Sequence, residues 1–132
     1  MEKQDKEILV DLYLSKGEET FADAVLCIEN GRWNSAANRL YYAVFHVLNA
    51  LLVSDEKPAC SHKGMRLAFG KNYVLTGLAS EEEAHLLSRM ETMRNKADYD
   101  CTFSAKADVV SELYPQVRDF VEHIKSLVKR KR

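Results

Sequence analysis

The 132-residue chain contains 46% hydrophobic and 30% charged residues at a net charge of −1, which excludes a disordered chain and predicts one globular domain over residues 1–132. The longest nearly apolar run, residues 41–53, is too short to span a membrane, and the charged first residues are unlike a signal peptide. The three cysteines are scattered without a C-x-x-C spacing, so we expect free thiols in the cytoplasm, no metal site and no cofactor.

Hydrophobic residues at helical spacing predict a first helix over about residues 6–28. Its hydrophobic stripe consists of Leu14, Phe21, Val25 and Ile28. The dipeptide Asn30-Gly31 predicts the end of this helix, because both residue types tolerate the left-handed backbone conformation that follows many helices.

A second helix is predicted over about residues 34–53, and it carries two neighbouring stripes. One stripe is hydrophobic and consists of Ala37, Leu40, Val44, Leu48 and Leu51. The other is polar and aromatic and consists of Asn38, Tyr42, His46 and Asn49. We interpret this second stripe either as a satisfied polar network of the core or as one side of a binding site.

Ser61 can cap a short third helix that ends near Phe69, and the chain between it and Ser80 is predicted to form a loop. Ser80 followed by Glu83 is a capping box, which opens a fourth helix through about Ala97.

A fifth helix begins near Ser104, and Pro115 inside it removes one backbone hydrogen bond and predicts a kink. Its hydrophobic stripe consists of Val110, Leu113, Val117, Phe120, Ile124 and Leu127. Because no alternating strand pattern of useful length is present, the predicted fold is all-α: an antiparallel four-helix up-and-down bundle with one extra short helix.

Charge is distributed unevenly along the chain. Residues 1–29 and 81–122 have an excess of acidic side chains, whereas residues 30–80 carry six basic and two acidic ones and the last ten residues carry five basic ones. One interpretation is a solvated basic tail with ordinary variation elsewhere. The other is that the middle of the chain forms a positive face for a nucleotide or an RNA backbone.

The fourth predicted helix places an arginine on its apolar side. Leu87, Met90, Arg94 and Asp98 are separated by three, four and four residues, so they share one face. Arg94 must therefore be paired, since an isolated buried charge is costly, and Asp98 is the predicted partner, with Tyr99 packing beneath the pair. This pair either fixes the helix end or shares a site with the polar stripe of the second helix.

The segments "NGRWNSAANRLYYAVFHVLNALL", "SHKGMRLAF", "VLTGL" and "RNKADYD" resemble the HEPN family (higher eukaryote and prokaryote nucleotide-binding domain) in order and spacing. The resemblance covers nearly the whole chain and is closest to the small stand-alone prokaryotic members. It implies a helical bundle, usually a homodimer, in which the second and fourth helices border a cleft. It also implies a toxin–antitoxin partnership with a minimal nucleotidyltransferase.

The resemblance carries the motif arginine onto Arg94 and the "DY" of the stand-alone subgroup onto Asp98 and Tyr99. In some related toxins, the partner adds adenylate to a tyrosine near the motif, which implies the same possibility for Tyr99. The residues expected to bind a nucleotide or RNA are Arg94, Asp98, Tyr99, Asn38, Arg39, Tyr42 and Lys63, with Arg66 a further phosphate-holding candidate.

Active members of the family are metal-independent ribonucleases with a histidine four to six residues after the arginine. Here those positions hold Tyr99, Asp100 and Cys101. His46 is the candidate catalytic base beside Arg94, whereas His85 lies on the opposite face of the fourth helix. Because tyrosine and aspartate are poor substitutes for histidine near neutral pH, the sequence predicts weak or absent ribonuclease activity.

Two functions remain open at this stage. The first is a nucleotide- or RNA-binding protein that works with a nucleotidyltransferase, and the second is a non-catalytic dimeric helical interaction module. A helical-repeat scaffold is set aside, because "ENGRWNSAANRLYYA" has no second copy at the repeat period.

Overall fold

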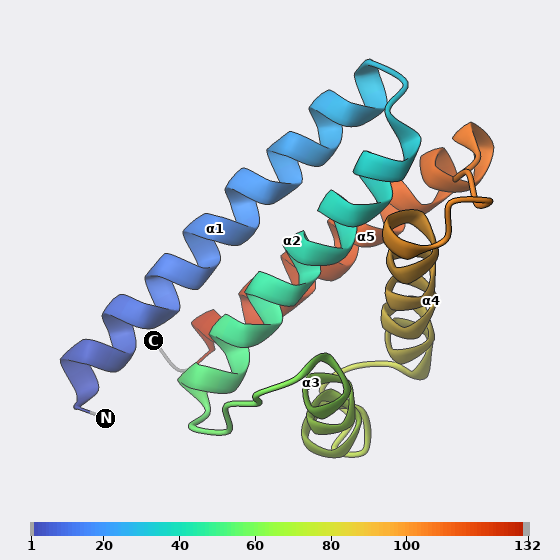
Figure 1. Ribbon diagram of the computed structural model, residues 1–132. Helices are drawn as coiled ribbons and strands as arrows, with labels where there is room; N and C mark the ends of the chain where they lie inside the picture. Colours follow the sequence, from blue (N-terminus) through green and yellow to red (C-terminus); the bar gives the residue numbers. More distant parts are fainter. Residues whose placement is uncertain (1, 131–132) are drawn as a thin grey trace.

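The computed structural model describes residues 2–130, which form helices joined by short connections (Figure 1). The elements are α1 (Lys3–Glu29), α2 (Trp33–Ser54), α3 (His62–Phe69), a π-helical segment η1 (Gly70–Val74), α4 (Glu81–Tyr99) and α5 (Ala107–Lys129). No strand occurs within residues 2–130, so the predicted all-α helical fold class is confirmed.

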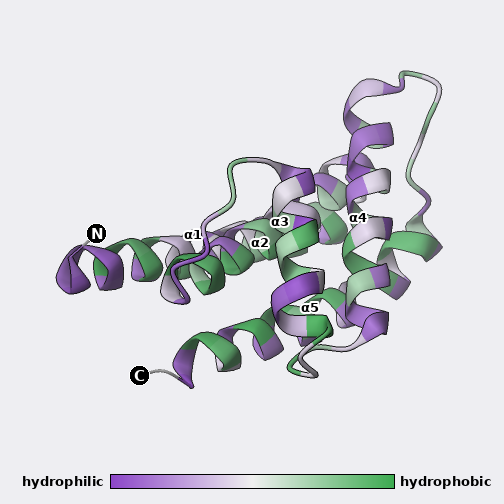
Figure 2. Ribbon diagram, turned by 90° about the horizontal axis from the view of Figure 1, so that it is seen from below, coloured by the Kyte–Doolittle hydropathy of each residue, from purple (hydrophilic) through white to green (hydrophobic). Residues whose placement is uncertain are grey.

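Helix α2 is the centre of the bundle. It packs against α1, α3, α4 and α5, and Figure 1 shows α1 and α2 side by side and antiparallel, with α5 behind α2 and α4 at a tilt to the pair. The predicted hydrophobic stripes of the second and fifth helices are buried at every position. In Figure 2, α5 accordingly alternates between hydrophobic and hydrophilic bands along its length.

Helix α1 differs from its prediction, because its most buried positions are small residues. These positions are Val10, Gly17, Thr20 and Ala24, whereas Leu14, Phe21 and Ile28 are only partly buried at the edge of the core. The two helices approach so closely that a Cβ built on Gly17 would lie 2.7 Å from Cγ1 of Val47 on α2. Large side chains therefore flank the contact; Phe21, for example, stacks on Tyr114 of α5.

The predicted helix ends are mostly confirmed. Gly31 has a φ of 67° after α1, and the Ser61 hydroxyl accepts a hydrogen bond from the backbone of Gly64 at the start of α3. The capping box of Ser80 and Glu83 opens α4. The remaining Glu83 oxygen lies 2.6 Å from Nδ1 of His123, so the same residue also joins α4 to α5.

The predicted loop after Phe69 is wrong in its first half, because the chain continues as η1 before it turns. Tyr73 explains this continuation: its ring is buried near Phe69, and its hydroxyl donates a hydrogen bond to Asp55 at 2.5 Å. Helix α5 begins later than predicted, since Asn34 accepts a hydrogen bond from the backbone of Ala105 and holds that segment outside the helix.

Up to Arg130, the basic C-terminal segment is part of the fold and not a solvated tail. Helix α5 continues to Lys129, Val128 is fully buried and Arg130 lies 3.1 Å from Asp55. The last two residues of the predicted tail lie outside the described part of the chain. No helix within residues 2–130 combines the length and the apolar character that a membrane crossing requires.

Candidate functional site

Arg94 lies in the last turns of α4 and is only 6% exposed. Its guanidinium carbon is 5.2 Å from the ring centre of Tyr41 and 5.4 Å from that of Tyr42, both on α2. The ring of Tyr99, at the end of α4, is 5.9 Å away. These distances are those of cation–π interactions, so three tyrosine rings cover the buried charge.

A chain of polar contacts links Arg94 to the first turns of α2. Asp98 Oδ2 lies 3.8 Å from Arg94 Nη1, which is an ion pair but too long for a hydrogen bond. The same oxygen accepts a hydrogen bond from Asn38 Nδ2 at 2.8 Å. The Asn38 carbonyl in turn accepts two hydrogen bonds from Arg39, at 2.9 and 2.6 Å. The predicted Arg94–Asp98 pair therefore exists, but its carboxylate is held by α2.

The hydrogen bonding of Arg94 is incomplete. Its Nε atom is buried and has no hydrogen-bond partner within the described residues. A buried polar group in this state is unusual and costs free energy, which calls for an explanation in terms of strain, catalysis or an absent ligand.

Most of the predicted binding residues belong to this arrangement. We define the Arg94 cluster as Arg94, Asp98 and Tyr99 of α4 together with Asn38, Arg39, Tyr41 and Tyr42 of α2. Tyr41 was absent from the sequence prediction because it lies one position away from the polar stripe. Lys63 is exposed at the start of α3, and no described interaction joins it to the cluster.

Tyr99 departs from its predicted packing. The residue is 79% exposed instead of buried beneath the ion pair, and it is the last residue of α4. One face of its ring lies toward Arg94 and the remainder is open to solvent. Its hydroxyl is thus accessible to another molecule.

The cluster borders a hollow of about 470 Å³ between the end of α1, the first turns of α2 and the last turn of α4. Asn38, Arg39 and Asp98 line it, together with Cys27 and Ser35. Its lining thus combines a guanidinium, an amide and a carboxylate, which are groups that bind phosphate, sugar hydroxyls and base edges.

His62, the first residue of α3, extends the aromatic side of the cluster. Its Nδ1 lies 2.6 Å from the hydroxyl oxygen of Tyr41. Its ring centre is 5.5 Å from that of Tyr41, 6.0 Å from that of Tyr42 and 4.7 Å from that of Phe45. His62 and Arg94 therefore share two tyrosine neighbours. The sequence places His62 only on a separate short helix, which gave no sign of this proximity.

The electrostatic surroundings keep both hydrogen-bonded partners neutral near pH 7. Burial and the Arg94 charge lower the pKa of His62, and the Glu91 carboxylate opposes them. Burial raises the pKa of Tyr41, and Glu91 adds to this increase. Glu91 itself pairs with Arg66 of α3 at 2.5 Å, so Arg66 is occupied by an acid next to the cluster.

His46, the predicted catalytic base, lies on the part of α2 that packs against α1. A Cβ on Gly17 of α1 would be 3.6 Å from the His46 Cβ, so this histidine sits against α1. Its Nδ1 is buried without a hydrogen-bond partner in the described chain, and burial lowers its pKa. Its ring lies 6.2 Å from that of Tyr42, but no described interaction joins it to Arg94.

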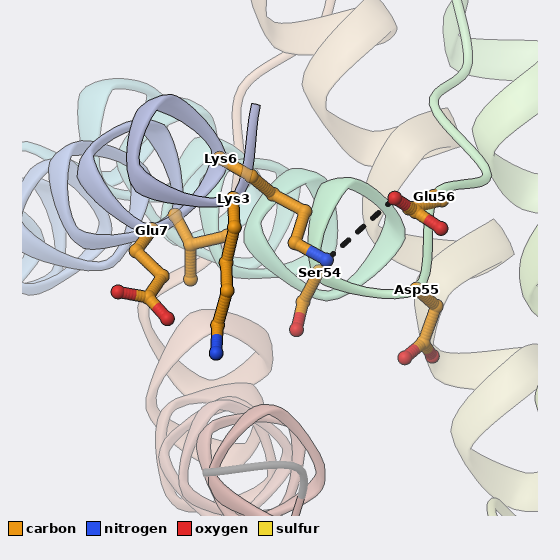
Figure 3. A pocket seen from close by; sticks show the side chains of 7 residues that line it. Lys3, Lys6, Glu7, Ser54, Asp55 and Glu56 are labelled. Atoms are coloured by element: carbon orange, nitrogen blue, oxygen red, sulfur yellow. Dashed lines mark ion pairs between the residues drawn. The ribbon is translucent and has the colours of Figure 1, made fainter. Parts of the chain in front are cut away.

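A second hollow, of about 230 Å³, contains none of the predicted site residues. It lies between the start of α1 and the end of α2, where Lys6 and Glu56 form an ion pair of 3.7 Å (Figure 3). Within residues 2–130, no group of three or more histidine, cysteine, aspartate or glutamate side chains is placed to hold a metal ion.

These observations define an all-α bundle with a buried arginine and a polar aromatic cluster between its second and fourth helices. The sequence profile of the HEPN domain matches residues 10–127. The chain therefore belongs to the HEPN family, as its sequence motifs predicted.

The chain is similar to proteins from Thermotoga maritima, Methanocaldococcus jannaschii and Archaeoglobus fulgidus. A protein named "UPF0332 protein" from Thermotoga maritima is 29% identical over 124 residues, which cover 94% of each chain. A protein named "Putative toxin MJ0605" from Methanocaldococcus jannaschii is 30% identical over 112 residues, which cover 85% of this chain and 83% of the relative. A further "UPF0332 protein", from Archaeoglobus fulgidus, is 25% identical over 123 residues, which cover 93% and 98%.

Proposed function

We propose that this protein binds RNA or a nucleotide through the Arg94 cluster, as the toxin component of a pair with a minimal nucleotidyltransferase. The observation that carries the proposal is the buried guanidinium of Arg94, whose Nε has no hydrogen-bond partner in the described chain. A phosphate oxygen would supply the acceptor that the described residues do not. The names of two relatives from Methanocaldococcus jannaschii include the word toxin, which supports the toxin role.

The aromatic side chains around Arg94 favour a ligand that contains bases. Tyr42 and Phe45 are partly exposed, and Tyr99 is largely exposed. Single-stranded RNA is bound by proteins mainly through bases that stack on aromatic rings and on arginine, while cationic groups hold the backbone. A guanidinium beneath accessible tyrosine rings fits this mode of binding.

The test is a titration of fluorescein-labelled single-stranded RNA, followed by anisotropy, with the wild type, Arg94→Gln and Arg118→Gln. Arg118 is a matched control, because it also lies near a tyrosine ring, at 5.9 Å from Tyr114, and pairs with an aspartate, but it is on α5 and exposed. We expect Arg94→Gln to weaken binding by at least about 10-fold and Arg118→Gln to have little effect. Equal losses would show only a general charge effect.

A parallel titration with ATP separates the two ligand classes, because a protein that binds a free nucleotide and not RNA will respond only in that titration.

The proposed partnership is tested by expression in a bacterial host with and without the cognate nucleotidyltransferase. Growth arrest that the partner relieves is the expected result. We also propose that the protein forms a homodimer, as its resemblance to the family implies. Light scattering tests this, and a monomer at micromolar concentration would contradict it.

A second candidate function is a helical interaction module without catalysis. It is favoured by exposed leucines at and after α3, since Leu67 is 59% exposed and Leu75 is 82% exposed. If this function is right, the wild type should bind neither RNA nor ATP in the titrations. Leu67→Ser should then abolish the binding of a partner protein.

A further inference from the structure

We propose that a groove on the outer side of α4 is a docking site for an acidic peptide segment of a partner protein, which inserts one large apolar side chain flanked by carboxylates. The groove has a volume of about 340 Å³ and lies between α4 and the connection to α5 (Figure 1). Its lining residues are Ser88, Arg89, Thr92, Met93, Lys96 and Phe103. The inference goes beyond the RNA or nucleotide binding proposed above and does not depend on it.

The groove lies on the side of α4 that faces away from the Arg94 cluster. Thr92 and Lys96 are each two positions from Arg94, and two positions correspond to a rotation of about 200° around an α-helix. Arg94 is buried against α2, whereas Arg89, Thr92 and Lys96 are exposed. A ligand in the groove therefore leaves the Arg94 cluster free for another molecule.

The floor of the groove is apolar. Met93 and Phe103 are partly buried and pack against the hydrophobic core. The backbone N–H of Phe103 donates a hydrogen bond to the carbonyl of Asp100 at 3.0 Å, which holds the chain after α4 in a turn. A methionine and an aromatic ring form an adaptable apolar surface, so this floor suits one large apolar side chain.

The rim of the groove is basic. Arg89 and Lys96 are exposed and form no ion pair in the described part of the chain, although the segment 81–122 that contains them carries ten acidic and five basic side chains. Asp100, one turn after Lys96, interacts with it only through its charge at longer range. The Asp100 carboxylate instead accepts hydrogen bonds from the backbone and the hydroxyl of Thr102, at 2.9 and 2.6 Å. The two cations therefore favour carboxylates of a binding partner.

The spacing of the two cations defines the peptide. Arg89 and Lys96 are seven residues apart on α4, which corresponds to a rise of about 10 Å along the helix. An extended chain advances about 3.3 Å per residue, so carboxylates three residues apart span this distance. An apolar side chain between them would contact Met93. The hydroxyls of Ser88 and Thr92 line the same groove and can donate hydrogen bonds to the peptide backbone.

The experiment measures the binding of a fluorescein-labelled hexapeptide, Gly-Glu-Phe-Ser-Glu-Gly, to the full chain by fluorescence anisotropy at low salt. Two further peptides replace the phenylalanine with serine or both glutamates with glutamine. We expect each replacement to lower the affinity by at least about 10-fold, because the apolar floor and the basic rim contribute separately. Raising the salt concentration should weaken the binding of the first peptide.

Variants of the protein test the groove itself. Arg89→Gln/Lys96→Gln removes the two charges, and Thr92→Trp fills the groove without changing the charge; each should weaken peptide binding by about 10-fold or more. The matched control Lys71→Gln/Lys129→Gln removes two exposed lysines that do not line the groove, and it should bind the peptide as the wild type does. Equal losses in the two double variants would show a general charge effect and overturn the proposal.

An RNA titration of the same variants distinguishes this inference from the proposed function. The expected result is that Arg89→Gln/Lys96→Gln loses peptide binding and keeps RNA binding. If the wild type does not bind the peptide, the proposal is overturned, and loss of RNA binding in this variant would then assign the groove to nucleic acid. Peptide binding by a wild type that does not bind RNA would remove the proposed function and support the groove.

Discussion

Replacing Arg94 with methionine separates a structural arginine from one kept for a ligand. Methionine has nearly the length of the arginine stem and no charge, so Arg94→Met preserves the apolar contacts and removes the guanidinium. The native residue is 6% exposed, and its only ion pair within residues 2–130 is the 3.8 Å contact with Asp98. The free energy of unfolding of the variant then reports what the charge contributes to the fold.

The contributions of the guanidinium to stability largely cancel. At an effective dielectric constant of about 20, a pair at this distance gains roughly 4 kcal/mol, but desolvation of the buried charge costs several kcal/mol. Three cation–π contacts add about 0.5–1 kcal/mol each, and the buried Nε without a partner costs about 1–3 kcal/mol. We therefore expect Arg94→Met to change stability by no more than about 1 kcal/mol.

Urea unfolding followed by circular dichroism measures this change, and Asp98→Ala provides the contrast. Removal of the carboxylate leaves the buried guanidinium without its counter-ion, so we expect about 1–3 kcal/mol of destabilisation; the half-open position of Asp98 keeps this below the figure for a fully buried pair. RNA binding should be lost in Arg94→Met. A destabilisation above about 3 kcal/mol with RNA binding intact would refute a functional Arg94.

Three further predictions concern other parts of the chain. Gly17→Ala should lower the urea midpoint, because its Cβ would lie 2.7 Å from a side-chain carbon of α2, whereas Gly70→Ala, with nothing within 4 Å, should leave it unchanged or raise it. His46 and His62 both have pKa values below the ordinary 6.5, so the unfolded chain binds protons more tightly than the folded chain. Stability should therefore be full above about pH 6.5 and fall as the pH drops toward the folded pKa values; a His46→Gln/His62→Gln variant should show a smaller difference between the urea midpoints at pH 7 and pH 5. Incubation with the cognate nucleotidyltransferase and ATP should add one adenylate mass to the wild type and none to Tyr99→Phe, since this tyrosine is 79% exposed; an unshifted wild-type mass would remove the idea.

Periodicity predicted the helices that bury the most hydrophobic surface. Helices α2 and α5 each carry an unbroken stripe at three-four spacing, and the fold buries every residue of both stripes. Helix α1 was harder to interpret, because it approaches α2 closely at Gly17 and buries Thr20, and both residues carry little hydrophobic signal. A pattern of large apolar residues indicates the flanks of such a contact and not its centre.

The candidate site was predictable only along single helices. The spacing on α4 placed Arg94 and Asp98 together, and the polar stripe on α2 indicated Asn38 and Tyr42. The proximity of His62 depends on how α3 docks beside α2, which no local pattern encodes. The exposure of Tyr99 likewise depends on where the chain turns after α4.

The polar chain from Arg39 through Asn38 and Asp98 to Arg94 also has a definite net charge. It contains two guanidinium groups and one carboxylate, and the amide between them adds no charge. The neighbouring Arg66 and Glu91 neutralise one another, so one positive charge remains over the whole cluster. One phosphodiester carries one negative charge, whereas a terminal phosphate monoester approaches two at neutral pH. An internal phosphodiester linkage of a polynucleotide therefore neutralises the charge of the cluster, whereas a terminal phosphate monoester would leave an excess of negative charge.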